Sequence, residues 1–487
     1  MIIVERKPAR FHPDYRRVII RFFDNGPERS EGLIRKIMEL NDNEVDCCLT
    51  EILRDFAKRH RNLTSAFLAH FEHAKEILKD SSLNFSRMKE HRKLLIGAYF
   101  SREYSIESAA FFNPSMVEAP DQSGLEDGSK RVFISFRATG EGHISSIVFR
   151  CGVIDYKNEI HFEKGRRYID EPEIVRRHSY DKRSFLERLQ EMNVAPEIIS
   201  MVTKPLGEKF IYGELLKSTK ETLQQNNLDE TRRRAVEKIL WMADSHYKVT
   251  FSRDTDISER VIFPVSYTER QGIEDARFVK FVDDGGRVLY YATYTAHDGH
   301  AILPKLIVTE DFYHFEIKPL HGKGAQNKNL ALFPKKINGQ YVMLSRLDGV
   351  NSYIGFSNNL TLWEEPVKLQ SPEHPWEFIQ IGNCGAPLET SRGWLVISHG
   401  VGPMRRYCLG ASLLDLENPT REIGRLKEPI LVPNNKERDG YVPNVVYSCG
   451  ALVHNKKVFI PYGFSDIGAG ILTFDLDNLL ERLSASS

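Results

Sequence analysis

Asp275-Ala276-Arg277-Phe278 is one copy of a four-residue motif that recurs along this sequence. The matching copies are Leu330-Ala331-Leu332-Phe333, Gly385-Ala386-Pro387-Leu388 and Gly450-Ala451-Leu452-Val453. The alanines recur every 55 to 65 residues, and each copy is followed by a turn and a second apolar strand, at 288–292, 341–344, 394–398 and 458–462. A period of about 55 residues with several short strands in each unit is typical of the blades of a β-propeller.

A fifth copy and two helical blocks complete the predicted organisation. Asn113-Pro114-Ser115-Met116-Val117, followed by the apolar run 131–136, looks like the fifth copy. Five copies predict a mainly β chain whose catalytic domain, 111–178 and 246–487, is a five-bladed β-propeller. A short apolar run followed by apolar residues at helical spacing predicts an N-terminal strand and helical segment over 1–110. The region 179–245 is predicted to be a helical insertion. We expect the insertion to pack on the N-terminal helices.

Composition argues against a polyanionic partner. The 487 residues carry 67 basic and 67 acidic side chains, so no overall field favours nucleic acid or anionic lipid. No apolar run reaches the roughly 20 residues of a membrane helix, and the first residues lack the apolar core of a signal peptide. The six cysteines follow no metal-ligand spacing and are expected to be buried free thiols, which predicts a cytoplasmic protein.

The residue before each repeated alanine suggests where the chemistry lies. One copy has Asp275 there, whereas the others have Leu330, Gly385 and Gly450. An acid at the start of a buried strand is costly unless it is paired or used. The structural alternative is an Asp275–Arg277 ion pair that only closes the ring of blades. Further polar residues are expected to converge on the same end of the blades: Asn113, Arg137, Asp298, Lys328, Arg346, His399, Tyr407, Tyr462 and Asp466.

Two kinds of ligand fit these side chains. Asn, Asp and Arg offer paired hydrogen bonds to vicinal hydroxyls, as a sugar requires. A cationic pocket rich in hydrogen-bond donors, suited to inorganic phosphate, would be formed by Lys328, Arg346, His399 and Tyr407. The histidines are scattered along the chain, so neither a metal site nor a cofactor is predicted.

Longer motifs form an ordered set along the β region. They are Gly272-Ile273-Glu274-Asp275-Ala276-Arg277-Phe278, Tyr294-Thr295-Ala296-His297-Asp298-Gly299, Leu330-Ala331-Leu332-Phe333-Pro334, Tyr407-Cys408-Leu409-Gly410-Ala411-Ser412-Leu413-Leu414-Asp415-Leu416, Tyr441-Val442-Pro443-Asn444-Val445-Val446 and Tyr462-Gly463-Phe464-Ser465-Asp466. Together they resemble the β-mannoside phosphorylases of glycoside hydrolase family 130. The resemblance covers about 113–479, apart from the helical insertion, and implies a five-bladed propeller.

The resemblance also implies an inverting reaction on a β-linked manno-oligosaccharide, with phosphate as co-substrate. Asp275 would be the general acid and would protonate the glycosidic oxygen through the 3-hydroxyl of the bound mannose. Phosphate would attack from the opposite face and release α-mannose 1-phosphate, so a cationic cradle would replace the second carboxylate of an inverting glycosidase. The substrate would be held by Asn113, Arg137, Asp298 and Asp466, and the phosphate by Lys328, Arg346, His399 and Tyr407.

Two departures from the phosphorylase pattern leave other reactions open. Ser345-Arg346 stands where many of these phosphorylases have His-Arg, and Lys328 stands where they have Arg. The main alternative is an inverting β-mannosidase in which Glu141 or Glu377 activates water. A mannosyltransferase that uses a nucleotide sugar and a non-catalytic glycan-binding propeller are further alternatives. The helical segments are expected to cover the channel mouth or to mediate homo-oligomerisation.

Overall fold

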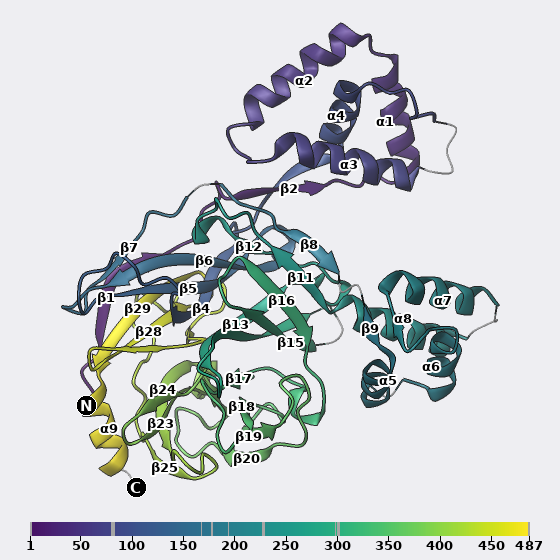
Figure 1. The fold of residues 1–487 in the computed structure, drawn as a ribbon. Coiled ribbons are helices and arrows are strands. Elements are labelled where there is room, and N and C mark those ends of the chain that lie inside the picture. The colour runs from purple at the N-terminus through teal and green to yellow at the C-terminus, as the bar shows by residue number, and fades with distance from the viewer. Residues whose placement is uncertain are drawn as a thin grey trace.

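Five antiparallel β-sheets form the body of the molecule, and two helical lobes project from it (Figure 1). The structure is a computed structural model that describes residues 2–78, 83–166, 168–176, 179–192, 194–225, 229–297, 299 and 302–485. Within these ranges the other strands form two short pairs: β2 (Val18–Phe22) with β3 (Ser101–Ser105), and β9 (Tyr180–Asp181) with β10 (Lys209–Phe210). The prediction of a mainly β chain is confirmed, and the five-bladed propeller stays a prediction.

The sheets are numbered in chain order of their main strands. Sheet 1 contains β4 (Ala110–Glu118), β5 (Lys130–Thr139), β6 (Ser145–Ile154), β7 (Ile160–Phe162) and β12 (Val261–Ile262). Sheet 2 contains β13 (Ile273–Val282), β14 (Val288–His297), β15 (Ile302–Thr309), β16 (His314–Pro319), β11 (Tyr247–Thr250) and β8 (Glu173–Arg176). Sheet 3 contains β17 (Ala331–Leu332), β18 (Tyr341–Ser345), β19 (Ser352–Ser357) and β20 (Val367–Gln370).

The last two sheets each have a divided first strand. Sheet 4 contains β21 (Gln380–Asn383) and β22 (Leu388–Thr390), both paired with β23 (Gly393–Val401), then β24 (Tyr407–Leu414) and β25 (Glu422–Arg425). Sheet 5 contains β26 (Val446–Tyr447) and β27 (Leu452–His454), both paired with β28 (Lys457–Phe464), then β29 (Gly468–Asp475) and β1 (Glu5–Phe11). We call β4, β13, β17, β21 with β22, and β26 with β27 the inner-edge strands.

Neighbouring sheets contact one another in a cyclic order. Sheet 1 meets sheet 2 through β4 and β13, and sheet 2 meets sheet 3 through β14 and β17. Sheet 3 meets sheet 4 through β18, β19 and β21, and sheet 4 meets sheet 5 through β24 and β26. Sheet 5 returns to sheet 1 through β28 and β4. The inner-edge strands of sheets distant in sequence are thereby brought together.

Local sequence explains how the strands reverse direction. Between β13 and β14, the Asp283 carboxylate accepts hydrogen bonds from the backbone N–H groups of Gly285 and Arg287, both at 2.9 Å. Between β17 and β18, Asn338 and Gly339 have φ values of 51° and 78°, the left-handed pair that a tight hairpin turn needs. Both turns lie where a turn is predicted between a repeated motif and the apolar strand that follows it.

Strand β1 is a part of sheet 5 that the sequence pattern did not predict. It pairs antiparallel with β29, Glu5 opposite Thr473 and Phe11 opposite Ala469. Its sequence, Glu-Arg-Lys-Pro-Ala-Arg-Phe, lacks the apolar alternation of a half-buried strand, because charged groups and a proline suit the edge of a sheet. Residues 5–11 thus belong structurally to the β body, although the predicted segment 1–110 included them.

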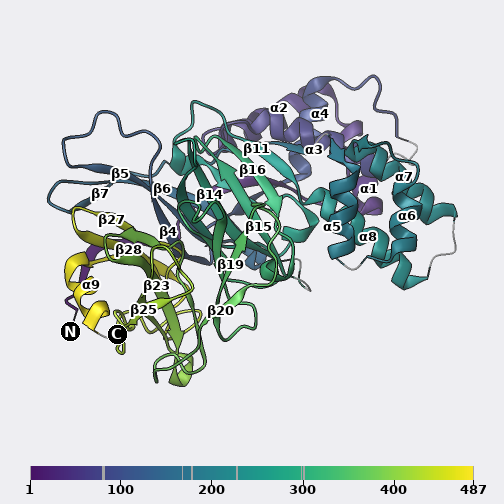
Figure 2. The same cartoon turned by 60° about the horizontal axis from the view of Figure 1, so that its bottom comes forward.

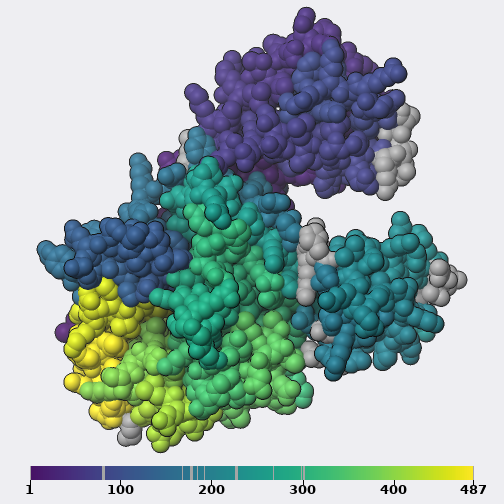
Figure 3. Space-filling model, viewed as in Figure 1, coloured from purple at the N-terminus to yellow at the C-terminus, as the bar shows by residue number. Residues whose placement is uncertain are grey.

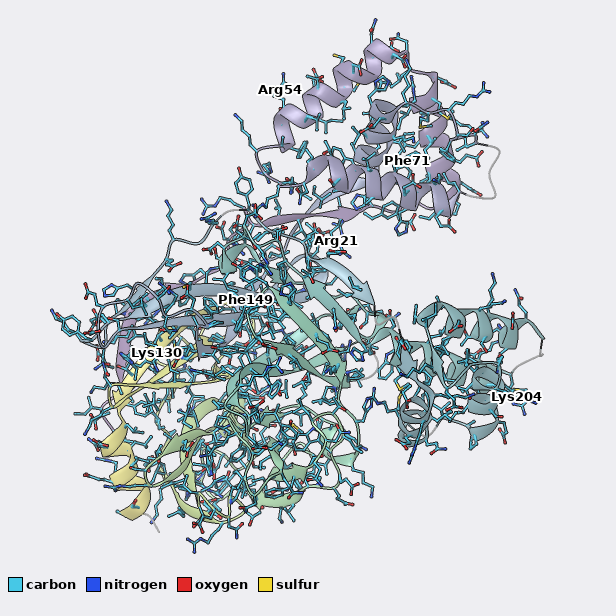
Figure 4. All side chains as sticks on the ribbon, viewed as in Figure 1. Arg21, Arg54, Phe71, Lys130, Phe149 and Lys204 are labelled. Carbon is cyan, nitrogen blue, oxygen red and sulfur yellow. The ribbon has the colours of Figure 1, made fainter. Side chains whose placement is uncertain are left out.

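The N-terminal lobe contains four helices: α1 (Pro27–Glu39), α2 (Asp42–Phe56), α3 (Leu63–Ile77) and α4 (Glu90–Tyr99). The helix α2 begins with a capping box, in which the Asn41 side chain accepts from the Glu44 N–H and the Glu44 side chain accepts from the Asn41 N–H. The helices end at Tyr99, and β3 then leads back to the body. At this junction Arg21 of β2 lies over the Phe263 ring, 4.5 Å from its centroid, above the core that contains Phe149 (Figure 4).

The second lobe is the predicted helical insertion, with α5 (Lys182–Glu191), α6 (Pro196–Thr203), α7 (Tyr212–Gln225) and α8 (Glu230–Asp244). It leaves the body after β8 and returns at β11, and these two strands pair with each other at the outer edge of sheet 2. The space-filling view shows open space between the two lobes (Figure 3). The expectation that the insertion packs on the N-terminal helices was therefore wrong, because each lobe buries its apolar faces within itself.

The chain ends beside the place where it begins. The final helix α9 (Leu476–Ala485) packs on β25, and both termini lie on the same side of the body in two views (Figure 1, Figure 2). Among the described residues, no helix is both long and apolar enough to cross a lipid bilayer. All six cysteines are free, as predicted, but Cys47 is exposed and Cys48 is half-buried, because both lie on the solvent-facing helix α2.

Candidate functional site

A bulge or a gap interrupts four of the five inner-edge strands, and a left-handed residue precedes the fifth, β17. Bulges in β4 and β13 coincide with left-handed residues, Asn113 (φ 47°) and Asp275 (φ 56°). In sheet 3 the left-handed residue is Asn329 (φ 67°). It lies one position before Leu330, the residue that corresponds to Asp275 in the repeated motif. Sheets 4 and 5 have gaps between their divided strands, and Gly385 (φ 129°) lies in the first gap. Bulges re-aim side chains, and here they aim them at one cluster.

Close approach explains why two sheets carry glycine at this level. A Cβ on Gly385 would lie 2.4 Å from the carbonyl oxygen of Cys449, and a Cβ on Gly450 would lie 2.5 Å from Oγ of Ser115. Neither position has room for a side chain. Asp275 thus carries an acid at the motif position where close packing in sheets 4 and 5 excludes any side chain.

Asp275 is held by an amide and flanked by two guanidinium groups. Nδ2 of Asn113 donates to Oδ1 of Asp275 at 2.7 Å. Nη1 of Arg137 lies 3.8 Å from Oδ1, and Nη2 of Arg277 lies 3.8 Å from Oδ2, both beyond hydrogen-bond distance. Arg277 instead donates to the Asp275 carbonyl at 2.9 Å and to the hydroxyl of Tyr447 at 2.7 Å. The carboxylate, 15% exposed, is therefore not consumed by the ring-closing ion pair considered from sequence.

Glu274 is a member of the cluster that the sequence did not single out. Its Oε1 accepts from Nη2 of Arg137 at 2.9 Å and its Oε2 accepts from Nζ of Lys328 at 2.8 Å. Burial alone would raise the pKa of Glu274, but Arg137 and Lys328 outweigh it and hold the pKa below its ordinary value. Adjacent residues of a strand normally face opposite sides, and only the bulge at Asp275 brings both acids into one cluster.

Asp466 reaches the cluster from the turn after β28. Ser465 and Asp466 are both left-handed, with φ values of 45° and 55°, and a Cβ on Gly463 would lie 2.8 Å from the backbone nitrogen of Asn113. The end of β28 therefore packs directly on Asn113. Burial raises the pKa of Asp466 to about 6, while Arg137 acts in the opposite direction and Asp275 adds to the rise.

A second group lies between sheets 3 and 4. Nη1 of Arg346 lies 3.3 Å from Nε2 of His399, and the His399 ring stacks on Tyr407 with centroids 6.1 Å apart and planes 12° apart. His399 is fully buried, and burial together with Arg346 and Arg277 keeps its pKa well below the ordinary value. The ring is therefore neutral, and because the arginine must donate, Nε2 accepts and Nδ1 carries the proton.

Tyr447 and Asn329 link the two groups, and neither was predicted as a site residue. The Tyr447 hydroxyl accepts from Nη2 of Arg277 and from Nδ2 of Asn329, at 2.7 and 3.0 Å. Its ring lies 4.8 Å from that of His399. Tyr447 directly follows the motif 441–446, which was the available signal for it in the sequence.

Three polar atoms of the cluster have no hydrogen-bond partner within the described ranges. Oδ1 of Asn113, Nε of Arg277 and Nε of Arg346 are all buried and unpaired. A buried amide oxygen and a buried guanidinium N–H without partners cost free energy unless a ligand satisfies them. Oδ1 of Asn113 is an acceptor beside the general acid candidate, and Nε of Arg346 is a donor beside His399.

Four predicted residues are engaged in other contacts or lie outside the described residues. The Tyr462 hydroxyl donates to Oε1 of Glu437 at 2.7 Å. Asp298 lies outside the described residues. Glu141 is exposed and ion-paired with Arg102 at 2.6 Å. Glu377 is fully buried and ion-paired with Arg425 at 3.2 Å. Both glutamates are thus engaged elsewhere, and neither is shown to contact Asp275.

Comparison with known proteins identifies one family. A model of glycoside hydrolase family 130, described as beta-1,4-mannooligosaccharide phosphorylase, matches residues 235–485. The chain is 37% identical over 218 residues to a 1,2-beta-oligomannan phosphorylase of Thermoanaerobacter sp. (strain X514), which covers 43% of this chain and 71% of the relative. It is 36% identical over 217 residues to a beta-1,2-mannobiose phosphorylase of the same strain, covering 43% of this chain and 69% of the relative.

A solved structure is similar over more of the chain. The beta-1,2-mannobiose phosphorylase from Listeria innocua, in complex with beta-1,2-mannobiose, aligns with a TM-score of 0.46 and 22% identity, covering 77% of this chain and 92% of the other. The family match begins at residue 235, so Asn113 and Arg137 lie outside it. Their positions beside Asp275 and Glu274 come from the fold alone.

Proposed function

The chain belongs to glycoside hydrolase family 130, and from this premise we propose that it is a β-mannoside phosphorylase. It cleaves the β-mannosidic bond of a manno-oligosaccharide with inorganic phosphate and releases α-mannose 1-phosphate. The relatives named above support this reaction class, since each is named as a phosphorylase of β-mannosides. The cationic residues of the cluster support it independently, because phosphate needs such a cradle.

In the proposed reaction Asp275 is the general acid. Its proton passes to O3 of the bound mannose while the O3 proton passes to the glycosidic oxygen, and the bond from C1 to that oxygen breaks. A phosphate oxygen attacks C1 from the other face, so the β-configuration is inverted to α. The 2.7 Å hydrogen bond from Asn113 supports this role because it fixes the carboxyl group, and a fixed acid is an effective one.

The mannose is proposed to lie between Asn113, Arg137 and Asp466. The unpaired Oδ1 of Asn113 would accept from a sugar hydroxyl. Asp466, whose pKa is raised to about 6, can act as donor when protonated and as acceptor when ionised. Asp298 is proposed as a further substrate ligand on the basis of the sequence resemblance.

The phosphate is proposed to bind Arg346, His399, Tyr407 and Lys328. Arg346 has a buried Nε–H without a partner, and Lys328 has three N–H donors of which one already goes to Glu274. His399, being neutral, adds no charge, and its Nε2 positions Arg346 by accepting from Nη1. The positive charge of the proposed phosphate site therefore comes from Arg346 and Lys328.

A five-bladed propeller is the proposed arrangement of the sheets. Five sheets of four or more strands and their cyclic contacts support it. In such an arrangement the inner-edge strands surround one axis, and ligands bind at the mouth of the central channel. Residues 111–178 and 246–487, with β1 added, would form the propeller.

Two of the unpaired buried atoms, Oδ1 of Asn113 and Nε of Arg346, carry the proposal, because the first can accept from a sugar hydroxyl and the second can donate to a phosphate oxygen. The test is incubation with β-1,2-, β-1,3- and β-1,4-mannobiose, with and without phosphate, followed by separate assays of mannose 1-phosphate and free mannose. Phosphate-dependent mannose 1-phosphate is expected. Free mannose at the same rate in phosphate-free buffer would instead establish the β-mannosidase.

A matched pair of variants locates the reaction. Asp275→Asn removes the transferable proton and should reduce turnover by at least about 1000-fold. Asp284→Asn changes an exposed acid in the hairpin at the far end of the same strand and should leave turnover unchanged. Equal activity of Asp275→Asn and wild type would overturn the assignment of the general acid.

A further inference from the structure

An exposed aromatic pair stands at the edge of the cluster. The rings of His143 and Tyr441 are stacked, with centroids 5.5 Å apart and planes 27° apart. Both residues are exposed, and Tyr441 has 68% of its surface open to solvent. His143 comes from the β5–β6 hairpin of sheet 1 and Tyr441 from the segment before β26 of sheet 5, so the pair joins two sheets without burying either ring.

The loop that carries His143 is held in a strained shape. Gly142 and His143 are both left-handed, with φ values of 69° and 60°, and for histidine this conformation costs roughly 1 kcal/mol. The loop is closed by a 3.0 Å bond from the Gly140 N–H to the Ile144 carbonyl, and the Tyr104 hydroxyl donates to the Glu141 carbonyl at 2.8 Å. Such fixing holds the imidazole away from the body instead of letting it fold onto the surface.

The corresponding hairpin of sheet 4 has the same backbone. Between β23 and β24, Met404 and Arg405 repeat the two left-handed positions, with φ values of 58° and 54°. Met404 is 89% exposed, and the charge of Arg405 acts to lower the pKa of Asp466. The hairpin of sheet 4 thus presents exposed side chains within electrostatic range of Asp466.

Tyr441 is fixed next to Asp466. The Val442 N–H donates to the Ser465 carbonyl at 3.2 Å, so the residue after Tyr441 is bonded to the residue before Asp466. The loop around Tyr441 is closed by Nε of Arg438, which donates to Oδ1 of Asn444 at 2.9 Å. On the other side, His143 follows the end of β5, the strand that carries Arg137. The pair therefore stands beside Asp466 and Arg137, two of the proposed mannose ligands.

We propose that His143 and Tyr441 form a binding subsite for the sugar ring next to the cleaved mannose, that is, for the pyranose of the leaving group. One face of a pyranose is lined with C–H groups, which pack well on the electron-rich face of an aromatic ring. A clasp that only joined the two sheets would bury its rings, and these rings are open to solvent. The inference rests on the proposed phosphorylase function, and its ligand class is a neutral hexopyranose.

The test uses the synthetic direction, in which mannose 1-phosphate donates to an acceptor sugar. Tyr441→Ala and His143→Ala should each raise the KM for the acceptor about tenfold and leave the KM for mannose 1-phosphate unchanged, whereas Tyr441→Phe should resemble wild type. Tyr156→Ala, at an exposed tyrosine on another hairpin, is the matched control. An unchanged acceptor KM in both alanine variants, with a lowered Tm, would show that the pair only joins the two sheets and binds no sugar.

Direct binding separates this inference from the proposed function. Calorimetric titration of β-mannobiose into the Asp275→Asn protein and into the Asp275→Asn, Tyr441→Ala protein requires no turnover. If wild type turns over no mannoside but the disaccharide still binds and Tyr441→Ala weakens it, the subsite stands and the phosphorylase assignment falls. If wild type is an active phosphorylase and Tyr441→Ala alters neither binding nor acceptor KM, the subsite falls alone.

Discussion

Asn113 donates a 2.7 Å hydrogen bond to Asp275, although the two residues are 162 positions apart and belong to different sheets. Each occupies a left-handed position in a bulge of its inner-edge strand. The bond therefore depends on two backbone distortions at once. Asn and Asp are the residues besides glycine that tolerate this conformation best, so the same sequence choice supplies both the backbone shape and the chemistry.

Replacing Asn113 should separate its chemical role from its backbone role. Asn113→Gly removes the amide while keeping a residue that adopts positive φ freely, so kcat/KM for the mannoside should fall about 100-fold with little change in Tm. Asn113→Ala should show the same kinetic loss and a lower Tm. Asn455→Gly, at an exposed left-handed asparagine (φ 42°), is the control and should alter neither. Full activity in Asn113→Gly would contradict the role of the amide.

Glu274 should matter to both substrates. In Glu274→Gln one accepting oxygen becomes an NH2 donor and the negative charge is lost, so the anchoring of Arg137 and Lys328 is weakened. The KM for phosphate and the KM for the mannoside should therefore both rise, by about tenfold, whereas Lys328→Ala should raise the KM for phosphate alone. Glu310→Gln, at an exposed glutamate of the same sheet, serves as the control. A selective effect of Glu274→Gln on one substrate would argue against the bridging role.

Arg346 should govern phosphate affinity through geometry as well as charge. Arg346→Lys keeps the charge but removes the buried Nε–H and the planar fork, so the KM for phosphate should rise about tenfold or more. The KM for the mannoside should stay as in wild type. Arg392→Lys changes an exposed arginine between β22 and β23 of sheet 4 and should leave both constants unchanged. A fully functional Arg346→Lys enzyme would mean that charge alone suffices.

Asp466 should make the folded protein less stable as the pH rises. Its pKa is raised to about 6 in the folded state, so between roughly pH 4 and 6 the folded protein binds more protons than the unfolded chain, and stability from this group falls as the pH increases. Asp466→Asn removes this term. The free energy of unfolding of the variant relative to wild type should therefore rise by on the order of 1 to 2 kcal/mol from pH 4.5 to pH 7, measured by urea unfolding. A difference that is flat across this range would show that Asp466 is ionised throughout.

The sequence predicted the positions of the repeats better than the details between them. The alanine repeat located the inner-edge strands, because close packing at the centre demands small residues, as Gly385 and Gly450 illustrate. Both helical blocks were predicted from a different signal, apolar residues that recur with helical spacing. Helical spacing did not show that the two lobes stand apart, since it reveals that a helix face is buried but not which surface covers that face.

The candidate site was predicted in part for a similar physical reason. Asp275 stood out as an acid among glycines and a leucine, and it lies in the cluster with Asn113 and Arg137. Glu274 and Asn329 were missed because only a bulge or a left-handed residue directs them inward, and simple strand alternation carries no sign of either. Tyr447 was missed because its role depends on contacts with Arg277 and Asn329, from two other sheets.

The pairing of β1 with β29 bears on how this chain is synthesised. Glu5 and Thr473 meet across 468 positions, so β1 leaves the ribosome long before β29, the strand it pairs with, has been translated. Throughout that interval it must avoid pairing with unfinished sheets or with other nascent chains. Its charged side chains and its proline are the features that discourage such pairing at a free edge. The charged side chains and the proline that make β1 hard to recognise in the sequence thus also keep it unpaired until β29 is present.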